Sequence, residues 1–591
     1  MGALATFTAV VPLEWGDVNI IHTTDTHGWL LGHQKTSFPE PNYSGDLGDF
    51  ASFVSHMKQI ALEKDVDLLL IDSGDLHDGK QGMPNVRLLW TGTGLSDGFP
   101  PGGVDGHETN KFLAMLPYDV MAIVRNNHEM SPFANTLDMH VNFAPKLNGR
   151  YLTSNVNITV PDAHGNAVSV PVGSRFAKFK TKKGREVTAL GVLFSFTGFA
   201  QNTTVQPVAD LVKESWFKEV IQEEPDFFLL VGHMPVQRDD WPLVFNAAVR
   251  AVHPTTPILI LGGHTHIRDC VQLDGRSMSL ESGRYMETVQ NLIGREAQNI
   301  TFSRRYLDPN RVTYEFHAQQ RNATFDTLQG KSITNGLLQL AQNFDLNFLF
   351  GTAPQDFTLS RDPFPSNGSL LTLFSTEAMP FSLTINNTRA NIPKIMITNS
   401  GSQRFDILKG PFTKNDQFTA SPFSDAFVFI PSVPSAIANK VLPALNDAGA
   451  DERKRSLFEK RERLAYERGY VDFVYRRWLE EMDRRHGLER RAVNNLTLGY
   501  VTTDACPGIG DDSIHAPLPF FPSPDFIGSN PPNVTDDTPI DLVFVDFIED
   551  QLIEILNSVQ SDKVFSSVDV QSYTDVLGNQ VLGLFAQHAW N

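Results

Sequence analysis

Residues 18–27 read VNIIHTTDTH, in which a short apolar run is followed at once by an aspartate and a histidine. Such a run, continuous and rich in β-branched residues or leucine, is typical of a strand buried on both faces of a sheet. Four further runs of this form lie at Val66–Ile71, Val120–Val124, Phe227–Val231 and Ile258–Leu261. Segments suited to helices lie between several of them, at Asp49–Glu63 and Val208–Glu223. The alternation predicts a layered α/β domain.

The second half of the chain is organised differently. A mostly helical pattern spans residues 312–345, and a second α/β region follows, with strands predicted at Ile392–Thr398 and Asp541–Phe547. Between these strands, residues 451–491 carry many charges of both signs. Their apolar members recur at helical spacing, at Val471, Tyr475, Trp478 and Met482. We expect a solvated helix packed by one face, although a basic docking surface has a similar composition.

The bulk composition excludes several classes of protein. With 41% hydrophobic and 20% charged residues over 591 positions, the chain has the balance of an ordinary globular protein. Its net charge of -19 argues against a nucleic-acid duplex or an anionic membrane as the main partner. No stretch of 18 apolar residues occurs, so we expect no transmembrane segment. A small phosphate compound stays possible where basic side chains or metals supply local positive charge.

A polar cluster follows each of the five apolar runs. The clusters are Asp25-Thr26-His27, Gly74-Asp75, Asn127-His128-Glu129, Gly232-His233 and Gly263-His264-Thr265-His266. In layered α/β domains, ligands collect beyond the carboxyl ends of the strands, which is where these clusters fall. One histidine after a strand is usually structural, but five such clusters in sequence are hard to produce by accident. Mixed His, Asp and Asn ligands suit Zn, Mn or Fe better than Ca.

The order of the five clusters resembles that of calcineurin-like metallophosphoesterases of the 5'-nucleotidase family, in particular its fungal secreted or vacuolar members. The resemblance covers about residues 17–290 and implies two divalent metal ions. It implies that one metal is held by Asp25, His27, Asp75 and His266. It implies that the second is held by Asp75, as a bridge, with Asn127, His233 and His264. Two such cations activate a water and neutralise developing phosphoryl charge.

The same resemblance makes His128 the catalytic residue that protonates the leaving oxygen or stabilises the transition state. The chain departs from the family pattern on either side of it. Arg125 and Asn126 stand where the family usually has a glycine before the Asn-His pair, and asparagine is the least costly replacement at positive φ. Ser131 stands where nucleotidases commonly have an aspartate that orients the catalytic ring. Glu129 and Asp78 are the candidates to replace it.

A second, shorter resemblance lies in the C-terminal half. The stretch 399–404, NSGSQR, followed by a Gly-Pro-x-Thr turn at 410–413 and a Pro-Phe pair at 422–423, resembles the substrate domain of 5'-nucleotidases. It implies four substrate-binding residues: Asn399, Gly401, Arg404 and Phe423. Arg404 would grip a phosphate or carboxylate with its planar fork, and Phe423 would stack on a base. The family's second stacking aromatic and ribose-binding aspartate have no clear match, and Asp511 or Asp512 is the candidate for the ribose.

Together the two resemblances imply the domain organisation. Residues 16–315 would form a four-layer α/β-β-α metallophosphoesterase sandwich, and 316–345 a helical connector. Residues 346–591 would form an α/β substrate domain with the charged helical insertion 451–491. The two domains would close over the substrate from a hinge near the connector.

Three functions are compatible with these residues. The first is a nucleotidase that hydrolyses phosphate esters of nucleotides through a water activated by two metals. The second keeps the hydrolysis but acts on a non-nucleotide phosphomonoester or a cyclic phosphodiester, because the second stacking motif is missing. The third is an inactive metal-binding homologue, suggested by the changes at Arg125 and Ser131. The intact ligand positions favour an enzyme over the third.

Signals for the secretory pathway are mixed. N-glycosylation sequons occur at Asn42, Asn157, Asn202, Asn299, Asn322, Asn367, Asn386, Asn495 and Asn533. They favour secretory passage and a vacuolar, extracellular or cell-surface location, although no signal peptide is evident in the chain. The two cysteines, Cys270 and Cys506, allow two free thiols or a single bridge between domains.

Overall fold

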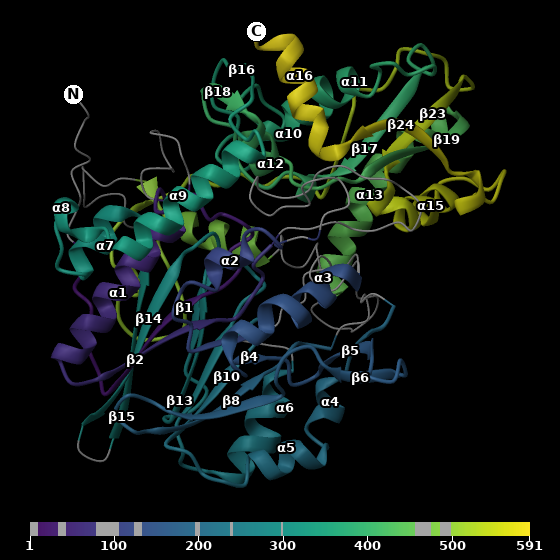
Figure 1. The fold of residues 1–591 in the computed structure, drawn as a ribbon. Coiled ribbons are helices and arrows are strands. Elements are labelled where there is room, and N and C mark those ends of the chain that lie inside the picture. The colour runs from purple at the N-terminus through teal and green to yellow at the C-terminus, as the bar shows by residue number, and fades with distance from the viewer. Residues whose placement is uncertain are drawn as a thin grey trace. The chain divides into compact units, whose positions relative to one another are not determined.

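The computed structural model describes residues 10–32, 43–77, 104, 106–122, 133–195, 201–236, 240–296, 299–455, 474–484 and 498–591. By compactness these residues divide into two units. The first contains the described residues between 10 and 341 and those between 477 and 518. The second contains those between 342 and 476 and from 519 onward. Figure 1 labels the helices and strands of both units.

Six strands form the first sheet of unit one, in the order β15-β14-β1-β2-β3-β4. They are β1 (Val18–Thr23), β2 (Asp67–Asp72), β3 (Val120–Ala122), β4 (Tyr151–Leu152), β14 (Thr288–Glu296) and β15 (Asn299–Leu307). Strands β1 to β4 run parallel, whereas β14 and β15 form an antiparallel hairpin beside β1.

Six more strands form a second sheet, in the order β12-β13-β11-β10-β8-β7. They are β7 (Phe176–Lys180), β8 (Glu186–Gly191), β10 (Phe227–Val231), β11 (Ile258–Gly262), β12 (Arg268–Val271) and β13 (Ser277–Ser282). The four central strands are parallel and the two edge strands antiparallel. A separate three-stranded sheet consists of β5 (Val156–Pro161), β6 (Ala167–Pro171) and β9 (Thr203–Val205).

The core of unit one lies between the two six-stranded sheets. Alternate residues of both sheets form one buried cluster, with Ile20 and Ile71 contributed by the first sheet and Leu229 and Leu261 by the second. Helices cover the outer faces (Figure 1). They are α1 (Leu47–Glu63) and α7 (Arg311–His317) on the first sheet, and α5 (Ser215–Val220) and α6 (Trp241–Val244) on the second. This order of layers confirms the predicted α/β-β-α sandwich.

Helix α1 shows how local sequence sets these layers. It begins at a capping box, in which Asp49 N donates to Asp46 Oδ1 at 2.7 Å and Asp46 N donates to Asp49 Oδ2 at 3.3 Å. Phe50, Val54 and Met57 follow at the three-to-four-residue spacing of one helix face and are all buried. The cap therefore fixes where the helix starts, and the apolar stripe fixes which face meets the sheet.

The five predicted strands are confirmed within one or two residues as β1, β2, β3, β10 and β11, and residues 123–124 of the third run lie outside the described part of the chain. The predicted helix 49–63 is α1. The predicted helix 208–223 is wrong as a single helix, because it is divided into α4 (Val208–Leu211) and α5. The division falls at Glu214, whose extended backbone, with ψ of 143°, interrupts the helical path.

Unit two contains a five-stranded sheet in the order β22-β17-β23-β19-β24. The strands are β17 (Lys394–Asn399), β19 (Ala426–Pro434), β22 (Phe526–Gly528), β23 (Pro539–Val545) and β24 (Gln571–Leu577). The strands predicted at 392–398 and 541–547 are confirmed as β17 and β23, which lie side by side and parallel. A smaller sheet pairs β16 (Leu349–Ala353) with β18 (Gly410–Thr413).

The helices of unit two include α10 (Leu370–Leu373), α11 (Met379–Ser382), α12 (Lys414–Ala420), α13 (Ser435–Arg455), α15 (Glu549–Ser558) and α16 (Val581–Ala589). Helix α13 contacts four strands of the larger sheet, β17, β19, β22 and β23, whereas α12 and α16 contact the smaller sheet. The helical pattern predicted for 312–345 is found as α7, α8 (Asn322–Phe325) and α9 (Leu328–Asn343). None of the described helices is both long and apolar enough to cross a membrane.

Residues 477–518 group with the first unit because covalent and polar bonds hold them there. Cys506 forms a disulfide with Cys270 of β12. The fully buried Arg268, two residues earlier, donates to Glu287, Asp308 and Asp511 at 2.9, 2.7 and 3.1 Å. The single bridge is therefore confirmed and two free thiols are wrong. It joins the predicted domains 16–315 and 346–591, but by compactness both cysteines lie in unit one. The domain boundaries 16–315, 316–345 and 346–591 remain predictions made from the sequence.

Of the charged insertion 451–491, the structure describes 451–455, the end of α13, and 474–484, so Val471 lies outside the described residues. In 474–484, Trp478 and Met482 are buried, and the Trp478 ring lies 5.2 Å from that of Tyr500. The burial of these side chains favours a helix packed by one face rather than a basic docking surface.

Candidate metal centre

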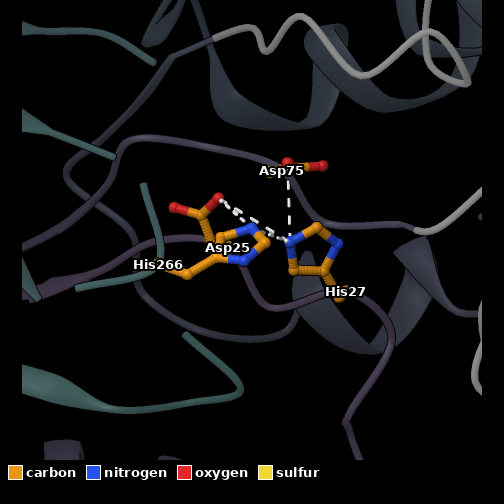
Figure 2. Close-up of side chains that lie close together, drawn as sticks. All are labelled: Asp25, His27, Asp75 and His266. Carbon is orange, nitrogen blue, oxygen red and sulfur yellow. Dashed lines mark hydrogen bonds and ion pairs between the residues drawn. The ribbon is translucent and has the colours of Figure 1, made fainter. Parts of the chain in front are cut away.

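Four polar loops follow strands of the two sheets in unit one. Asp25 and His27 come after β1, and Asp75 follows β2, its parallel neighbour in the first sheet. His233 follows β10, and the Gly263–His266 loop follows β11, its parallel neighbour in the second sheet. Since parallel neighbours end at the same edge of a sheet, the loops of each pair meet there. Stacking of the two sheets then brings the pairs together, as Figure 2 shows for four side chains.

The donor atoms of Asp25, His27, Asp75 and His266 all lie within 4.8 Å of one another, and all four residues are buried. Asp25 Oδ1 faces the Nε2 atoms of His27, His233 and His266 at 3.7, 3.7 and 3.4 Å. These distances are too long for strong hydrogen bonds, and Asp25 Oδ1 accepts none. They fit ligands around a common cation, because two atoms each about 2.0–2.2 Å from a metal lie 3–4 Å apart.

Asp75 lies between histidines of the two sheets. Its Oδ2 is 3.6 Å from His27 Nε2 and 3.4 Å from His233 Nε2. The His264 ring lies beside that of His233, with ring centroids 5.1 Å apart. The cluster of four therefore continues through Asp75 toward His233 and His264, which the sequence assigned to a second metal. Asn127 and the catalytic candidate His128 lie outside the described residues, as do Arg125, Ser131, Glu129 and Asp78.

The backbone of this cluster is strained. Asp25, His27, Asp75, His264 and His266 have positive φ, at 51, 50, 59, 86 and 62°. A non-glycine residue in this region costs about 1–3 kcal/mol, and such strain persists only where surrounding bonds enforce it. Backbone bonds between the loops do so: Asp25 N donates to Gly74 O at 2.7 Å, and His27 N donates to Asp75 O at 3.0 Å. Concentrated strain of this kind is typical of a functional site.

Two glycines are required by close approach. A Cβ on Gly263 would lie 2.2 Å from Thr24 Oγ1 and 2.7 Å from Asp25 Oδ2, and one on Gly232 would lie 1.9 Å from Val192 O. This explains why both Gly-His motifs begin with glycine. Any side chain at Gly263 would push the β11 loop away from Asp25.

Further hydrogen bonds fix the orientation of the Asp25 carboxylate. Thr24 Oγ1 and the backbone N of His264 both donate to Asp25 Oδ2, at 2.8 and 3.0 Å. Oδ2 is therefore satisfied by the protein, while Oδ1 faces the three imidazoles. Although burial alone would raise the pKa of Asp25, the facing His233, His266 and His27 hold it well below the usual range. Burial lowers the pKa of His266 to about 4. Asp25 thus offers an ionised carboxylate and His266 a neutral imidazole, the forms that bind metal.

The second unit carries the other candidate residues. Asn399 ends β17, and Gly401 lies in the short turn Ser400–Ser402 that follows. The guanidinium of Arg404 lies 5.0 Å above the ring of Phe423. Phe423 is only 6% exposed. The structure thus brings Arg404 and Phe423 together as a cation–π pair and places Asn399 and Gly401 at the carboxyl end of a central strand.

Comparisons with known proteins agree with both halves of this description. Residues 18–268 match the model for the calcineurin-like phosphoesterase family, and residues 356–553 match that for the C-terminal domain of NAD nucleotidase. A protein of Arthroderma benhamiae named "Secreted protein" is 34% identical over 98% of this chain and 91% of its own length. The chain belongs to the 5'-nucleotidase family of calcineurin-like metallophosphoesterases.

Two further relatives support this membership. An uncharacterized protein of Schizosaccharomyces pombe is 33% identical over 95% of this chain and 89% of its own length. The crystal structure of a 5'-nucleotidase from Candida albicans has a TM-score of 0.81 and 30% identity, covering 99% of this chain and 100% of that chain. In this metallophosphoesterase, the buried Asp/His cluster is consistent with the metal site of the family. The secreted homologue and the disulfide are consistent with the secretory pathway.

The sequence motifs did not indicate the residues that hold the strand ends beneath the metal loops together. His22, inside the first apolar run, is fully buried, and its Nε2 lies 2.9 Å from Ser73 Oγ. Ser73 Oγ donates in turn to Gly262 O at 2.8 Å, so His22 Nε2 is the donor to Ser73. This chain links the ends of β1, β2 and β11. A polar residue inside an apolar run was the signal that would have identified it.

Two other supporting contacts were missed. The backbone N of Thr265 donates to Glu281 Oε1 at 2.9 Å, and the Thr265 hydroxyl donates to the same atom. In unit two, Arg476 Nη2 donates to Ser400 Oγ at 2.8 Å and so holds the turn that contains Gly401. Neither pairing has a sequence signal, because the partners belong to different elements, 16 and 76 positions apart. The suggested ribose ligands Asp511 and Asp512 are instead buried in unit one, bonded to Arg268 and His317.

Proposed function

We propose that this protein is a metal-dependent phosphohydrolase that acts on nucleotides. The observation that carries the proposal is the position of Asp25 Oδ1, buried without a hydrogen-bond donor and 3.4–3.7 Å from three imidazole nitrogens. A buried carboxylate oxygen that lacks a donor and faces several imidazole nitrogens has the surroundings of a metal ligand. The match of residues 356–553 to a nucleotidase C-terminal domain supports a nucleotide as the substrate.

The proposed ligands fall into two sets that share Asp75. Asp25, His27, Asp75 and His266 would hold one divalent cation, and Asp75, Asn127, His233 and His264 would hold the other. The 3.6 and 3.4 Å distances from Asp75 Oδ2 to His27 and His233 support the bridging role of Asp75. The ions, Zn, Mn or Fe, would supply Lewis acidity and a water of lowered pKa near the phosphate. The chain's own contribution is to fix the ligand oxygens and nitrogens before substrate arrives.

Other residues are assigned to proton transfer and substrate binding. His128 is proposed to donate a proton to the leaving oxygen or to stabilise charge there. Arg404 is proposed to bind a substrate phosphate or carboxylate, Asn399 and Gly401 to border the nucleoside, and Phe423 to pack on its base. Binding of the nucleoside would then position the scissile phosphate.

The test is hydrolysis by the metal-loaded protein of AMP, UMP and ADP, measured as phosphate release, and of NAD and UDP-glucose, measured by chromatography of the products. Bis-p-nitrophenyl phosphate, measured as nitrophenol release, is the simple ester. Asp75→Asn should abolish hydrolysis of every substrate. Arg404→Ala should raise KM for nucleotides while leaving the simple ester unchanged. Asp356→Asn, a change of the same size in unit two, is the control for the loss of a carboxylate. The absence of hydrolysis of every nucleotide tested would contradict the proposal.

A second candidate function is favoured by one observation. The Phe423 ring is 6% exposed and lies beneath the Arg404 guanidinium, so it offers little face to a base. A non-nucleotide phosphomonoester or a cyclic phosphodiester would need no such face. A clear preference for such an ester over all nucleotides, unchanged in Phe423→Leu, would establish this function instead.

We also propose that the protein passes through the secretory pathway to a vacuolar, extracellular or cell-surface location. The support is the disulfide, which persists in oxidising compartments, and the relative named as a secreted protein. Fractionation of tagged full-length protein tests this, and a purely cytosolic signal would contradict it.

A further inference from the structure

Unit two contains a cavity of about 640 Å³ that the proposed reaction does not use. Its wall is formed by Phe350 of β16, residues of α12, the edge strand β24 and the start of α16. The remaining side is the turn after α11, where Asn386, Asn387 and Thr388 all line the cavity. This turn is a glycosylation sequon, Asn-Asn-Thr.

The hydrogen bonds of the turn leave Asn386 exposed at the rim of the cavity. The Asn387 side chain donates to Leu383 O at 2.9 Å and to Tyr573 O of β24 at 3.0 Å, and accepts from Arg389 N at 2.8 Å. These bonds tie the turn to the edge strand. Asn386 itself has a φ of 53°, a conformation that asparagine tolerates, and it is exposed, as is Thr388. The acceptor and the hydroxyl of the sequon are thus both accessible at the rim of the cavity.

The chemistry of the wall fits a neutral carbohydrate. Phe350, which is half-buried, contributes aromatic surface on which the C–H face of a sugar ring packs, whereas Phe418 and Tyr573 line the cavity with little of their surface exposed. Gln417 and Gln580 contribute amides that match sugar hydroxyl and acetamido groups. The charged wall residues, Lys414 and Asp575, have opposite signs, so the cavity has no net attraction for an anion such as a nucleotide.

We propose that Asn386 carries an N-linked glycan whose first sugars pack in this cavity and cover its apolar wall. The donor would be an oligosaccharide on a lipid diphosphate, the form supplied in the secretory pathway. A bond forms between Asn386 Nδ2 and C1 of the first sugar, the bond from C1 to the diphosphate oxygen breaks, and Nδ2 loses one proton as the lipid diphosphate leaves. The glycan then shields the turn 384–388 and the edge strand β24.

The first measurement is site occupancy. The full chain is expressed in a eukaryotic secretory host, and its peptides are analysed by mass spectrometry after enzymatic release of glycans in ¹⁸O water. The peptide containing Asn386 should carry the label that marks an occupied site. An unlabelled Asn386 beside labelled Asn533, an exposed sequon that does not line the cavity, would overturn the proposal.

The second measurement separates a packed glycan from one that extends into solvent. Native protein is treated either with an endoglycosidase that leaves one sugar on each asparagine or with an amidase that removes all of them. Hydrogen exchange at 381–388 and 571–577 should stay slow after the first treatment and become several-fold faster after the second. Asn386→Gln and Thr388→Ala should show the fast exchange, and Asn533→Gln should not. Equal exchange in the two treated samples and the three variants would overturn the packing of the glycan.

Discussion

The Nε2 atoms of His27 and His266 lie 2.9 Å apart, although 239 positions separate the two residues in the chain (Figure 2). The His27 loop follows a strand of the first sheet and the His266 loop a strand of the second. The lone pairs of two imidazole nitrogens at this distance repel each other and the Asp25 carboxylate unless a proton or a cation lies between the nitrogens. The pKa of His266, lowered to about 4 by burial, leaves its ring neutral at neutral pH, the form in which it can bind a cation.

Removal of metal should therefore lower the stability of the first unit. A ligand at 100 times its dissociation constant stabilises the folded state by about 2.7 kcal/mol. We expect chelator treatment to lower the Tm by several degrees and added Zn or Mn to restore it, as measured by scanning calorimetry. His266→Ala should have a Tm that does not respond to either treatment. His164→Ala, at an exposed turn of unit one, is the matched control and should respond like the unchanged protein.

Glu281 should act as a positioning residue for the 264–266 loop. Its Oε1 accepts two bonds from Thr265, and burial raises its pKa well above the usual range, which favours the neutral carboxyl. Glutamine reproduces a neutral acceptor, whereas alanine leaves the loop unsupported. Glu281→Ala should weaken metal binding by about 10–100-fold, measured by competition with a chelating dye. Glu281→Gln should stay within a few-fold of the unchanged protein. Equal losses in both variants would contradict a positioning role.

The disulfide should stabilise the first unit and leave the second unaffected. Cys270 and Cys506 are separated by 236 positions, and both lie in the core cluster of unit one. Cross-links of this kind contribute about 2–4 kcal/mol, chiefly by restricting the unfolded chain. The double variant Cys270→Ala, Cys506→Ala should lower the calorimetric transition of the metal-responsive unit. A matching shift in a transition that does not respond to metal would show that the cross-link acts on the whole chain.

The Asp308–His515 pair predicts a pH dependence of stability. His515 Nε2 lies 2.6 Å from Asp308 Oδ2, and both residues are buried. Burial alone would lower the pKa of His515, but Asp308 raises it above 6.5. Burial alone would raise the pKa of Asp308, but His515 and Arg268 lower it to about 2.

A raised histidine pKa contributes stability that is complete below pH 6.5 and is lost as the pH rises through the folded value. A lowered aspartate pKa contributes stability that is complete above pH 3.8 and is lost as the pH falls toward 2. The difference in free energy of unfolding between the unchanged protein and His515→Gln should thus be largest between about pH 4 and 6.5 and smaller on either side. Urea unfolding across that range measures it, and a constant difference would show that the pair does not titrate on unfolding.

The metallophosphoesterase half could be predicted largely from local sequence. Each strand such as β1 or β11 is an apolar run that ends at a ligand motif, and both signals lie within about ten residues. The predicted helix at 208–223 was wrong because its break at Glu214 has no glycine or proline to mark it. The substrate half was less predictable, because the covering of Phe423 by Arg404 depends on packing between residues 19 positions apart.

The sequence by itself determined three features: the order along the chain in which metal loops follow strands, the types of ligand, and the membership of the C-terminal half in a nucleotidase-like domain. Those features rest on periodicity and short motifs, which act over a few residues. Only the tertiary structure decided that Cys270 pairs with Cys506 inside one unit, that Glu281 and His22 support the metal loops, and that the Asn386 sequon borders a cavity. These contacts join segments far apart in the chain, and their energies depend on burial and mutual distance, which exist only once the sheets have packed.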